Sequence, residues 1–178
     1  MRRAGTAVAL AVVVAMTSWS LGAESAGAAS KPTFTLTSPA FGDNDAIPAT
    51  FTCKGAGTQP ALAWRGIPKR AKQLALIVED PDAPVGTFVH WVVAGIAPKP
   101  ASFGEDAEPP GAVEGTNGAG RTGWIPPCPP SGTHHYIFTL YALDEKVKAP
   151  AGVGATALRS LIKGKVVARA KLTGLFGA

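Results

Sequence analysis

The chain has 178 residues, a net charge of +5, 21 glycines and 16 prolines. Glycine and proline at this frequency suit short strands joined by turns, and they suit long helices poorly. The basic residues are scattered, and their densest groups, at 65–72 and 163–171, lack the interleaved aromatic side chains of a nucleic-acid surface. We therefore expect a β-rich protein with no nucleic-acid partner.

The N-terminal residues have the three-part layout of a secretory signal peptide. Two arginines precede an apolar stretch over residues 7–16, and small residues follow at 26–28. We expect a signal peptide over residues 1–29 and a single domain over 30–178, exported as a secreted, periplasmic or cell-envelope protein. The apolar stretch is shorter than the about 20 residues of a membrane span, so stable membrane insertion is not expected. No cysteine lies near the cleavage site, which argues against a lipid anchor.

Seven segments are predicted to be strands because most of them carry β-branched or aromatic residues. They are residues 34–37, 47–52, 61–64, 74–79, 88–96, 136–144 and 166–173. In the segment "YIFTLYALD" both alternating faces are largely apolar, which predicts a central strand covered on both sides.

One helix is predicted near the C-terminus, in the segment "GATALRSLIKG" at 154–164. Apolar residues recur three and four positions after Leu158, Thr156 is the expected N-cap, and Gly164 is the expected stop. The expected architecture is therefore mostly β, a β-sandwich with one late α-helix that crosses to a final strand.

A long stretch with little periodicity lies between residues 98 and 133. A structureless segment of that length in a compact domain is usually functional or disordered. Its end, "PCPPSG", leads through His134 and His135 into the predicted central strand. We therefore predict a loop that forms part of a pocket.

The three histidines fall in two segments, each beside a strong predicted strand. In "FVHWVV" the two-residue period of a strand puts His90 on the face of Phe88 and Val92, with Trp91 on the opposite face. The other two histidines open the 136–144 strand. If the two strands are neighbours, one pocket at the end of the sandwich contains Asp80, Asp82, His90, His134 and Tyr136.

Such a pocket suits a small anion. Imidazole and phenol groups can donate hydrogen bonds to oxygen, and a carboxylate beside an imidazole orients it or favours its protonated form. Carboxylates repel an anion unless they are hydrogen-bonded to a histidine or to amides of the turn. Asp80 and Asp82 are therefore expected to shape the pocket and to orient the histidines. Phosphate, or a zwitterionic head group with phosphate and ammonium, fits this description.

Two cysteines, Cys53 and Cys128, are compatible with two interpretations. In an oxidising compartment they can form a disulfide, and each can equally be a small buried hydrophobic residue beside a pocket. The sequence leaves both open.

A catalytic function is the main alternative. Asp80, Asp82, His90 and His134 have the side-chain types of a zinc-dependent hydrolase, but they lack a short ligand spacing such as H-E-x-x-H. There is no G-x-S-x-G motif for a serine nucleophile, and no dinucleotide or P-loop fingerprint. We therefore expect a non-catalytic binding or modulator protein without a metal or cofactor.

Several separated motifs resemble the phosphatidylethanolamine-binding protein family, in its bacterial Raf-kinase-inhibitor-like branch. They are "FTCKGAGTQPALAWRGIP", "DPDAP", "HWVV", "GTNG", "PCPPSG" and "HHYIFTLYALD", in that order along the chain. The resemblance covers about residues 34–174. It implies a β-sandwich with a small pocket at one end that binds phosphate-like or phosphoethanolamine-like groups, and a protein target such as a protease.

The resemblance also assigns residues. It carries pocket roles onto Asp80, Asp82, His90, His134 and Tyr136, with Pro129 and Pro130 as one wall. It makes Pro84 and the prolines within 126–130 candidates for cis peptide bonds. His135 stands where the family usually has arginine, and "GWIP" at 123–126 differs from the usual rim sequence. Since histidine is mostly neutral at pH 7, weaker or more pH-dependent binding is expected if that side chain holds the loop or the anion.

Overall fold

The computed structural model describes Met1 and residues 33–178. The signal peptide predicted over 1–29 therefore lies, except for its first residue, outside the described residues. In chain order the elements are β1 (Thr35–Thr37), β2 (Asp45–Ala46), a 3-10 helix η1 (Ala49–Phe51), β3 (Leu62–Arg65), β4 (Gln73–Asp80), β5 (Phe88–Ile96), β6 (Ser102–Phe103), β7 (Val113–Glu114), β8 (Thr133–Leu143), α1 (Ala155–Ile162) and β9 (Val166–Gly177).

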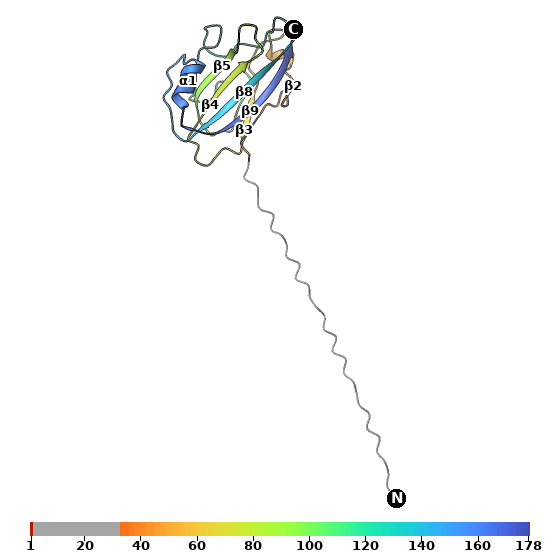
Figure 1. Ribbon diagram of the computed structural model, residues 1–178, viewed down its shortest axis with the longest axis vertical. Coiled ribbons are helices and arrows are strands. Elements are labelled where there is room, and N and C mark those ends of the chain that lie inside the picture. The colour runs from red at the N-terminus through yellow and green to blue at the C-terminus, as the bar shows by residue number, and fades with distance from the viewer. Residues whose placement is uncertain (2–32) are drawn as a thin grey trace. The chain divides into compact units, whose positions relative to one another are not determined.

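The strands form two sheets. The larger sheet has six strands in the order β2-β9-β8-β4-β5-β7, and the smaller has three in the order β1-β3-β6. Figure 1 shows β5, β4, β8 and β9 side by side, with α1 next to β5. The described part of the chain contains no helix that is long and apolar enough to cross a membrane.

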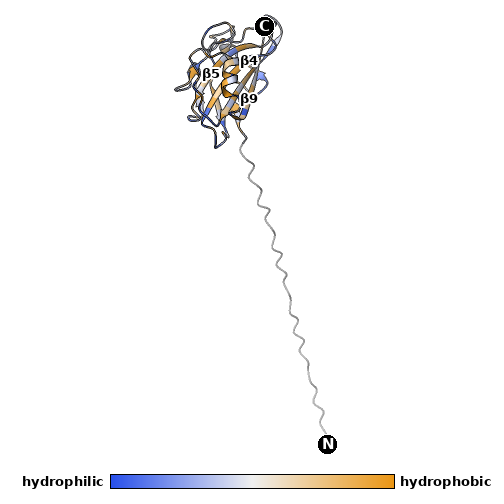
Figure 2. Cartoon of the chain, turned by 60° about the vertical axis from the view of Figure 1, so that its left-hand side comes forward, coloured by the Kyte–Doolittle hydropathy of each residue, from blue (hydrophilic) through white to orange (hydrophobic). Residues whose placement is uncertain are grey.

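Each face of the large sheet packs on its own hydrophobic core. Leu74 and Leu76 of β4 belong to the core shared with the small sheet, whereas Ala75 and Ile77 of the same strand belong to the core with Leu158 of α1. Successive side chains of a strand point to opposite faces, so a strand covered on both sides must be apolar throughout. Figure 2 accordingly shows β4 and β5 largely in the hydrophobic colour. The predicted β-sandwich with a late helix is confirmed.

Strand β8 is central, as its two apolar faces predict. It lies between β4 and β9 in the large sheet. Tyr136 and Phe138 point into the core shared with the small sheet, and Tyr141 and Leu143 point into the core under α1. Full burial of each large side chain stabilises the fold by about 1.5–3 kcal/mol.

The predicted strand over 47–52 is wrong. Strand β2 ends at Ala46, and after Pro48 the chain turns into the 3-10 helix η1. Proline has no N–H to donate to a sheet, and the Thr52 hydroxyl and N–H both donate to the Ala49 carbonyl, at 2.9 and 3.0 Å. These local hydrogen bonds replace the ladder that a strand would need.

The helix occurs where it was predicted, but its N-cap differs. The N-cap is Gly154, whose carbonyl accepts the N–H of Leu158 at 2.9 Å, so Thr156 lies inside the first turn. Gly164, with φ of 79°, follows the end of the helix as expected.

Two open questions about covalent geometry are answered among the described residues. The single cis peptide bond is Lys99–Pro100, so the candidates Pro84 and the prolines within 126–130 are trans. Cys53 and Cys128 form a disulfide, with their Cα atoms 5.4 Å apart. The bond links the segment after η1 to the loop before β8.

Candidate ligand-binding pocket

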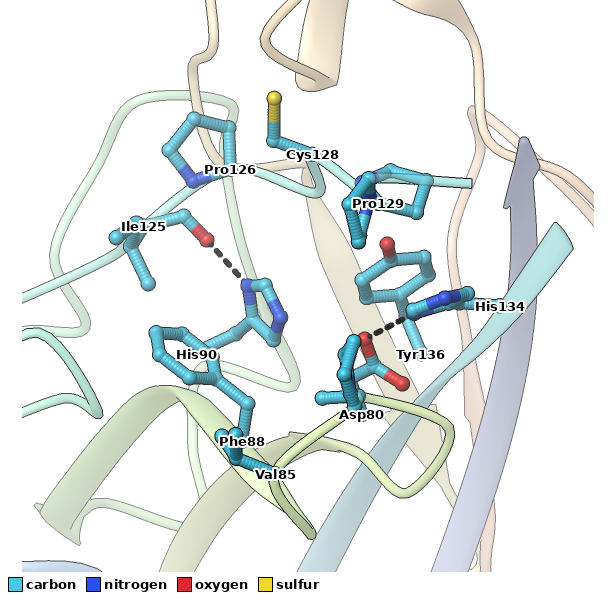
Figure 3. A pocket seen from close by; sticks show the side chains of 13 residues that line it. Asp80, Val85, Phe88, His90, Ile125, Pro126, Cys128, Pro129, His134 and Tyr136 are labelled. Atoms are coloured by element: carbon cyan, nitrogen blue, oxygen red, sulfur yellow. Dashed lines mark hydrogen bonds and ion pairs between the residues drawn. The ribbon is translucent and has the colours of Figure 1, made fainter. Parts of the chain in front are cut away.

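A pocket of about 240 Å³ lies where the end of β4 meets the starts of β5 and β8 (Figure 3). Its lining is mostly apolar, with four polar side chains. The apolar and disulfide residues are Ala83, Pro84, Val85, Phe88, Ile125, Pro126, Cys128, Pro129 and Pro130, and the polar ones are Asp80, His90, His134 and Tyr136.

Sheet register explains why residues far apart in sequence meet here. Strand β4 is paired with β8 through Glu79 and Ile137 and with β5 through Asp80 and Phe88. The end of β4 is therefore flanked by His90 on one side and by the start of β8 on the other. The His90 and Tyr136 ring centroids are 5.0 Å apart. The expectation that the two histidine-bearing strands are neighbours is wrong, because β4 lies between β5 and β8 in the sheet. The side chains still meet, because β5 and β8 both start beside the end of β4.

A β-bulge in β5 aims His90 into this pocket. Val78 pairs with Trp91 and the next residue, Glu79, pairs with Val89, so His90 is an extra residue in β5. His90 and Trp91 both lie against Trp124, with ring centroids 6.2 and 5.9 Å away. The prediction that Trp91 faces away from His90 is therefore wrong, because strict alternation fails at a bulge.

His90 is a neutral, oriented imidazole. Its Nδ1 lies 2.8 Å from the carbonyl oxygen of Ile125, and since a carbonyl only accepts, Nδ1 carries the hydrogen. Burial lowers the pKa of His90, and the hydrogen bond to Ile125 offsets this only in part. At pH 7 the ring is therefore uncharged, and Nε2 presents a lone pair. In Figure 3 this second nitrogen points toward the space between the labelled side chains.

Asp80 orients His134. One carboxylate oxygen of Asp80 lies 2.7 Å from His134 Nδ1, and the other accepts the backbone N–H of Asp82 at 2.8 Å. Both side chains are buried. Because both oxygens already accept hydrogen bonds from the protein, the carboxylate is held in place as a structural group of the pocket wall.

The Tyr136 hydroxyl is a buried donor without a partner. Its side chain is fully buried, and its oxygen makes no hydrogen bond to any described residue. Burial, and secondarily the charges of Asp80 and Asp82, raises the pKa of Tyr136, so the phenol stays protonated. An unsatisfied buried hydroxyl costs about 1–3 kcal/mol. A ligand that accepts this hydrogen bond would remove that cost.

Asp82 lies outside the pocket. Its Oδ2 accepts the backbone N–H of His135 at 2.8 Å and lies 2.7 Å from His135 Nδ1. These hydrogen bonds lower the pKa of Asp82. Both side chains are largely exposed. His135 therefore holds the turn that follows β4 and does not reach the cavity. The set proposed for zinc, which includes Asp82, is not brought together.

The loop over 125–130 is tied down at several points. Besides the Cys53–Cys128 disulfide, Cys53 donates its N–H to the Pro127 carbonyl at 3.0 Å, and Trp124 Nε1 donates to the Gly57 carbonyl at 3.1 Å. Pro129 and Pro130 line the pocket, as expected from the resemblance.

Sequence reasoning missed most of the apolar wall, including Val85, Phe88, Ile125 and Pro126. A signal existed for Phe88, because it lies two residues before His90 on the same strand face. Its ring centroid is 5.0 Å from that of His90. No sequence pattern marks Ile125, which contributes through its backbone carbonyl.

The fold and the pocket together define a β-sandwich protein with a small, largely apolar cavity at one end. The chain matches the profile of the family described as "Phosphatidylethanolamine-binding protein" over residues 37–177. The chain therefore belongs to the phosphatidylethanolamine-binding protein family.

Relatives and solved structures agree. The chain is 41% identical over 146 residues to the UPF0098 protein of Methanothermobacter thermautotrophicus, covering 79% of this chain and 97% of the relative. It is 43% identical over 144 residues to LppC of Mycobacterium tuberculosis, whose name proposes a lipoprotein, covering 80% and 71%. The crystal structure of a proposed family homologue from Chlamydia trachomatis superposes with a TM-score of 0.80 at 38% identity, covering 83% and 99%. That of YbcL from E. coli gives 0.76 at 28% identity, covering 82% and 98%.

Proposed function

We propose that the chain is an exported, non-catalytic binding or modulator protein whose pocket holds a phosphate-like or phosphoethanolamine-like group. The observation that carries the proposal is the buried, protonated and unpartnered hydroxyl of Tyr136 beside the neutral His90. A phosphate oxygen accepts the phenol hydrogen, and a protonated phosphate oxygen donates to the lone pair of His90 Nε2.

The cavity has the size of a head group. Its volume of about 240 Å³ is below the range of roughly 300–1,000 Å³ that is typical of pockets for drug-sized ligands. The lining contains no lysine or arginine among the described residues, so no permanent cation faces the ligand. Binding therefore depends on a proton shared between the phosphate and His90.

The chemistry of the lining supports binding without turnover. Asp80 has both oxygens engaged, and His90 uses Nδ1 for the Ile125 carbonyl. Cys128 is part of a disulfide and cannot act as a nucleophile. Ser131 is outside the lining. No side chain in the cavity is arranged as an activated nucleophile.

Two features extend the proposal to location and target. The signal-peptide pattern and the name of the relative LppC favour a cell-envelope or secreted protein. At the pocket mouth Val85 is 96% exposed, and such an apolar side chain is suited to contact with a protein target such as a protease.

Isothermal titration with phosphoethanolamine and with inorganic phosphate tests the pocket. His90→Ala and Tyr136→Phe should each weaken binding by about tenfold or more, since a hydrogen bond to a charged group contributes about 1.5–3 kcal/mol. Ser131→Ala is the control, because it removes a hydroxyl close to the 125–130 loop without changing the pocket lining. Equal affinities for all four proteins would rule out this pocket.

A further inference from the structure

A second concave site lies on the other face of the same strands. It has a volume of about 340 Å³, and its lining includes Glu79, Ile137, Arg159, Arg169 and Lys171. We call it the basic groove. Glu79 precedes Asp80 and Ile137 follows Tyr136, so strand alternation puts the groove and the pocket on opposite faces of the sheet.

The groove combines three permanent cations with one carboxylate. Arg169 and Lys171 are two residues apart on β9 and therefore share a face of the sheet. Their cross-strand neighbours on β8 are Tyr141 and Thr139, respectively. Arg159 reaches over from α1 and forms an ion pair with Glu79. Lys171 makes no ion pair with any described residue. The lining thus has a net charge of +2.

The two guanidinium groups are held in position before any ligand arrives. The Arg169 guanidinium carbon lies 5.5 Å from the centre of the Tyr141 ring, and Arg159 is fixed by its hydrogen bond to Glu79. A positioned guanidinium loses less side-chain entropy on binding than a freely moving one. This arrangement, set in a concavity, differs from lysines scattered over a convex surface.

We propose that the basic groove is a second anion site, which takes a phosphate or sulfate group of a soluble ligand. The two N–H groups of an arginine side chain can donate together to two oxygens of a tetrahedral oxyanion, and Thr87 and Thr139 line the same space. The inference is independent of the function proposed for the pocket. The two sites differ in chemistry, because the groove carries fixed positive charge whereas the pocket needs a shared proton.

Sulfate separates the two sites, since it is fully ionised at neutral pH and has no proton to give to His90. In a titration with sulfate at about pH 8, followed by 1H–15N NMR, the largest backbone shifts are expected at Thr139, Tyr141, Arg169 and Lys171. Pocket residues should stay unshifted at this pH, where the pKa of His90, already below its ordinary value of about 6.5, leaves the ring neutral.

Variants make the test quantitative. Arg169→Gln with Lys171→Gln should weaken sulfate binding more than about tenfold, by analogy with charge pairs near a protein surface. The control, Lys146→Gln with Lys148→Gln, removes the same charge from exposed lysines outside the groove and should leave affinity nearly unchanged. Glu79→Gln removes the one negative charge of the lining but keeps an oxygen that can accept the Arg159 hydrogen bond. It should strengthen binding about fivefold, a gain that misfolding cannot produce.

Equal losses of sulfate affinity in the two double variants, or no loss in either, would contradict the second anion site. The basic groove would then be a solvent-exposed basic surface without a specific site. Phosphoserine should bind with the same dependence on Arg169 and Lys171 as sulfate does. Vesicles of phosphatidylglycerol should not bind in this way. Tighter binding to vesicles than to phosphoserine would contradict the proposal of a soluble ligand.

Discussion

The Asp80 carboxylate and the His134 imidazole form a buried hydrogen bond, with Oδ2 2.7 Å from Nδ1, that joins the end of β4 to the start of β8. The bond spans 54 residues of sequence and forms part of the pocket wall. It is a charge-assisted contact between two buried side chains, where hydrogen bonds are stronger than at the surface.

Asp80→Asn should lower the free energy of unfolding by about 1.5–3 kcal/mol, because it removes the charge from a buried hydrogen bond. Asp82→Asn is the matched control, since Asp82 makes an equally short contact with His135 in an exposed position, where ion pairs contribute little. Urea denaturation measures both. A larger loss for Asp82→Asn than for Asp80→Asn would contradict the assignment.

Phosphoethanolamine binding should weaken as the pH rises from about 7 to about 8. Burial holds the pKa of His90 below its ordinary value of about 6.5, and a phosphate ester loses its second proton near pH 6. When the pH is above both pKa values, neither free His90 nor the free phosphate group carries the proton that the two share in the complex. Binding must therefore take up one proton from solution. The association constant should therefore fall about tenfold per pH unit.

His90→Ala should remove this pH dependence along with most of the affinity, and calorimetry in buffers of different ionisation enthalpy should count the proton taken up. A pH-independent affinity of the unaltered protein between about pH 7 and 8 would show that no proton is shared with His90.

The Cys53–Cys128 disulfide closes a sequence separation of 75 residues. On the chain-entropy account its removal by Cys53→Ser and Cys128→Ser should lower the free energy of unfolding by roughly 4 kcal/mol. Phosphate affinity should fall as well, because Cys128 lines the pocket and the bond anchors the 125–130 loop. Thermal unfolding and calorimetry of the double serine variant check both effects. Unchanged affinity would show that the hydrogen bonds of Cys53 and Trp124 hold the loop on their own.

The strands of the sheet were predictable because the hydrophobic pattern that specifies each strand lies within a short segment of sequence. The doubly apolar pattern of β8 follows from burial on both faces and predicted a central strand, whereas the short strand segments separated by turns predicted the β-sandwich. The meeting of Asp80 with His134 followed from the positions at which those strands end.

Other features depend on contacts between segments that a local pattern does not contain. The bulge that turns His90 and Trp91 to one side arises from pairing between β4 and β5. The orientation of Asp82 away from the cavity depends on the turn that Asp80 holds and on His135. The pairing of Cys53 with Cys128 needs the three-dimensional approach of their two loops.

A crystal structure of the protein soaked with phosphoethanolamine at about pH 6 tests the central claim most directly. One phosphate oxygen should lie about 2.6–2.8 Å from the Tyr136 hydroxyl and another about 2.7–3.0 Å from His90 Nε2, with the His90–Ile125 and Asp80–His134 hydrogen bonds retained. Ligand bound elsewhere on the molecule, with the Tyr136 hydroxyl still lacking a partner, would contradict the account.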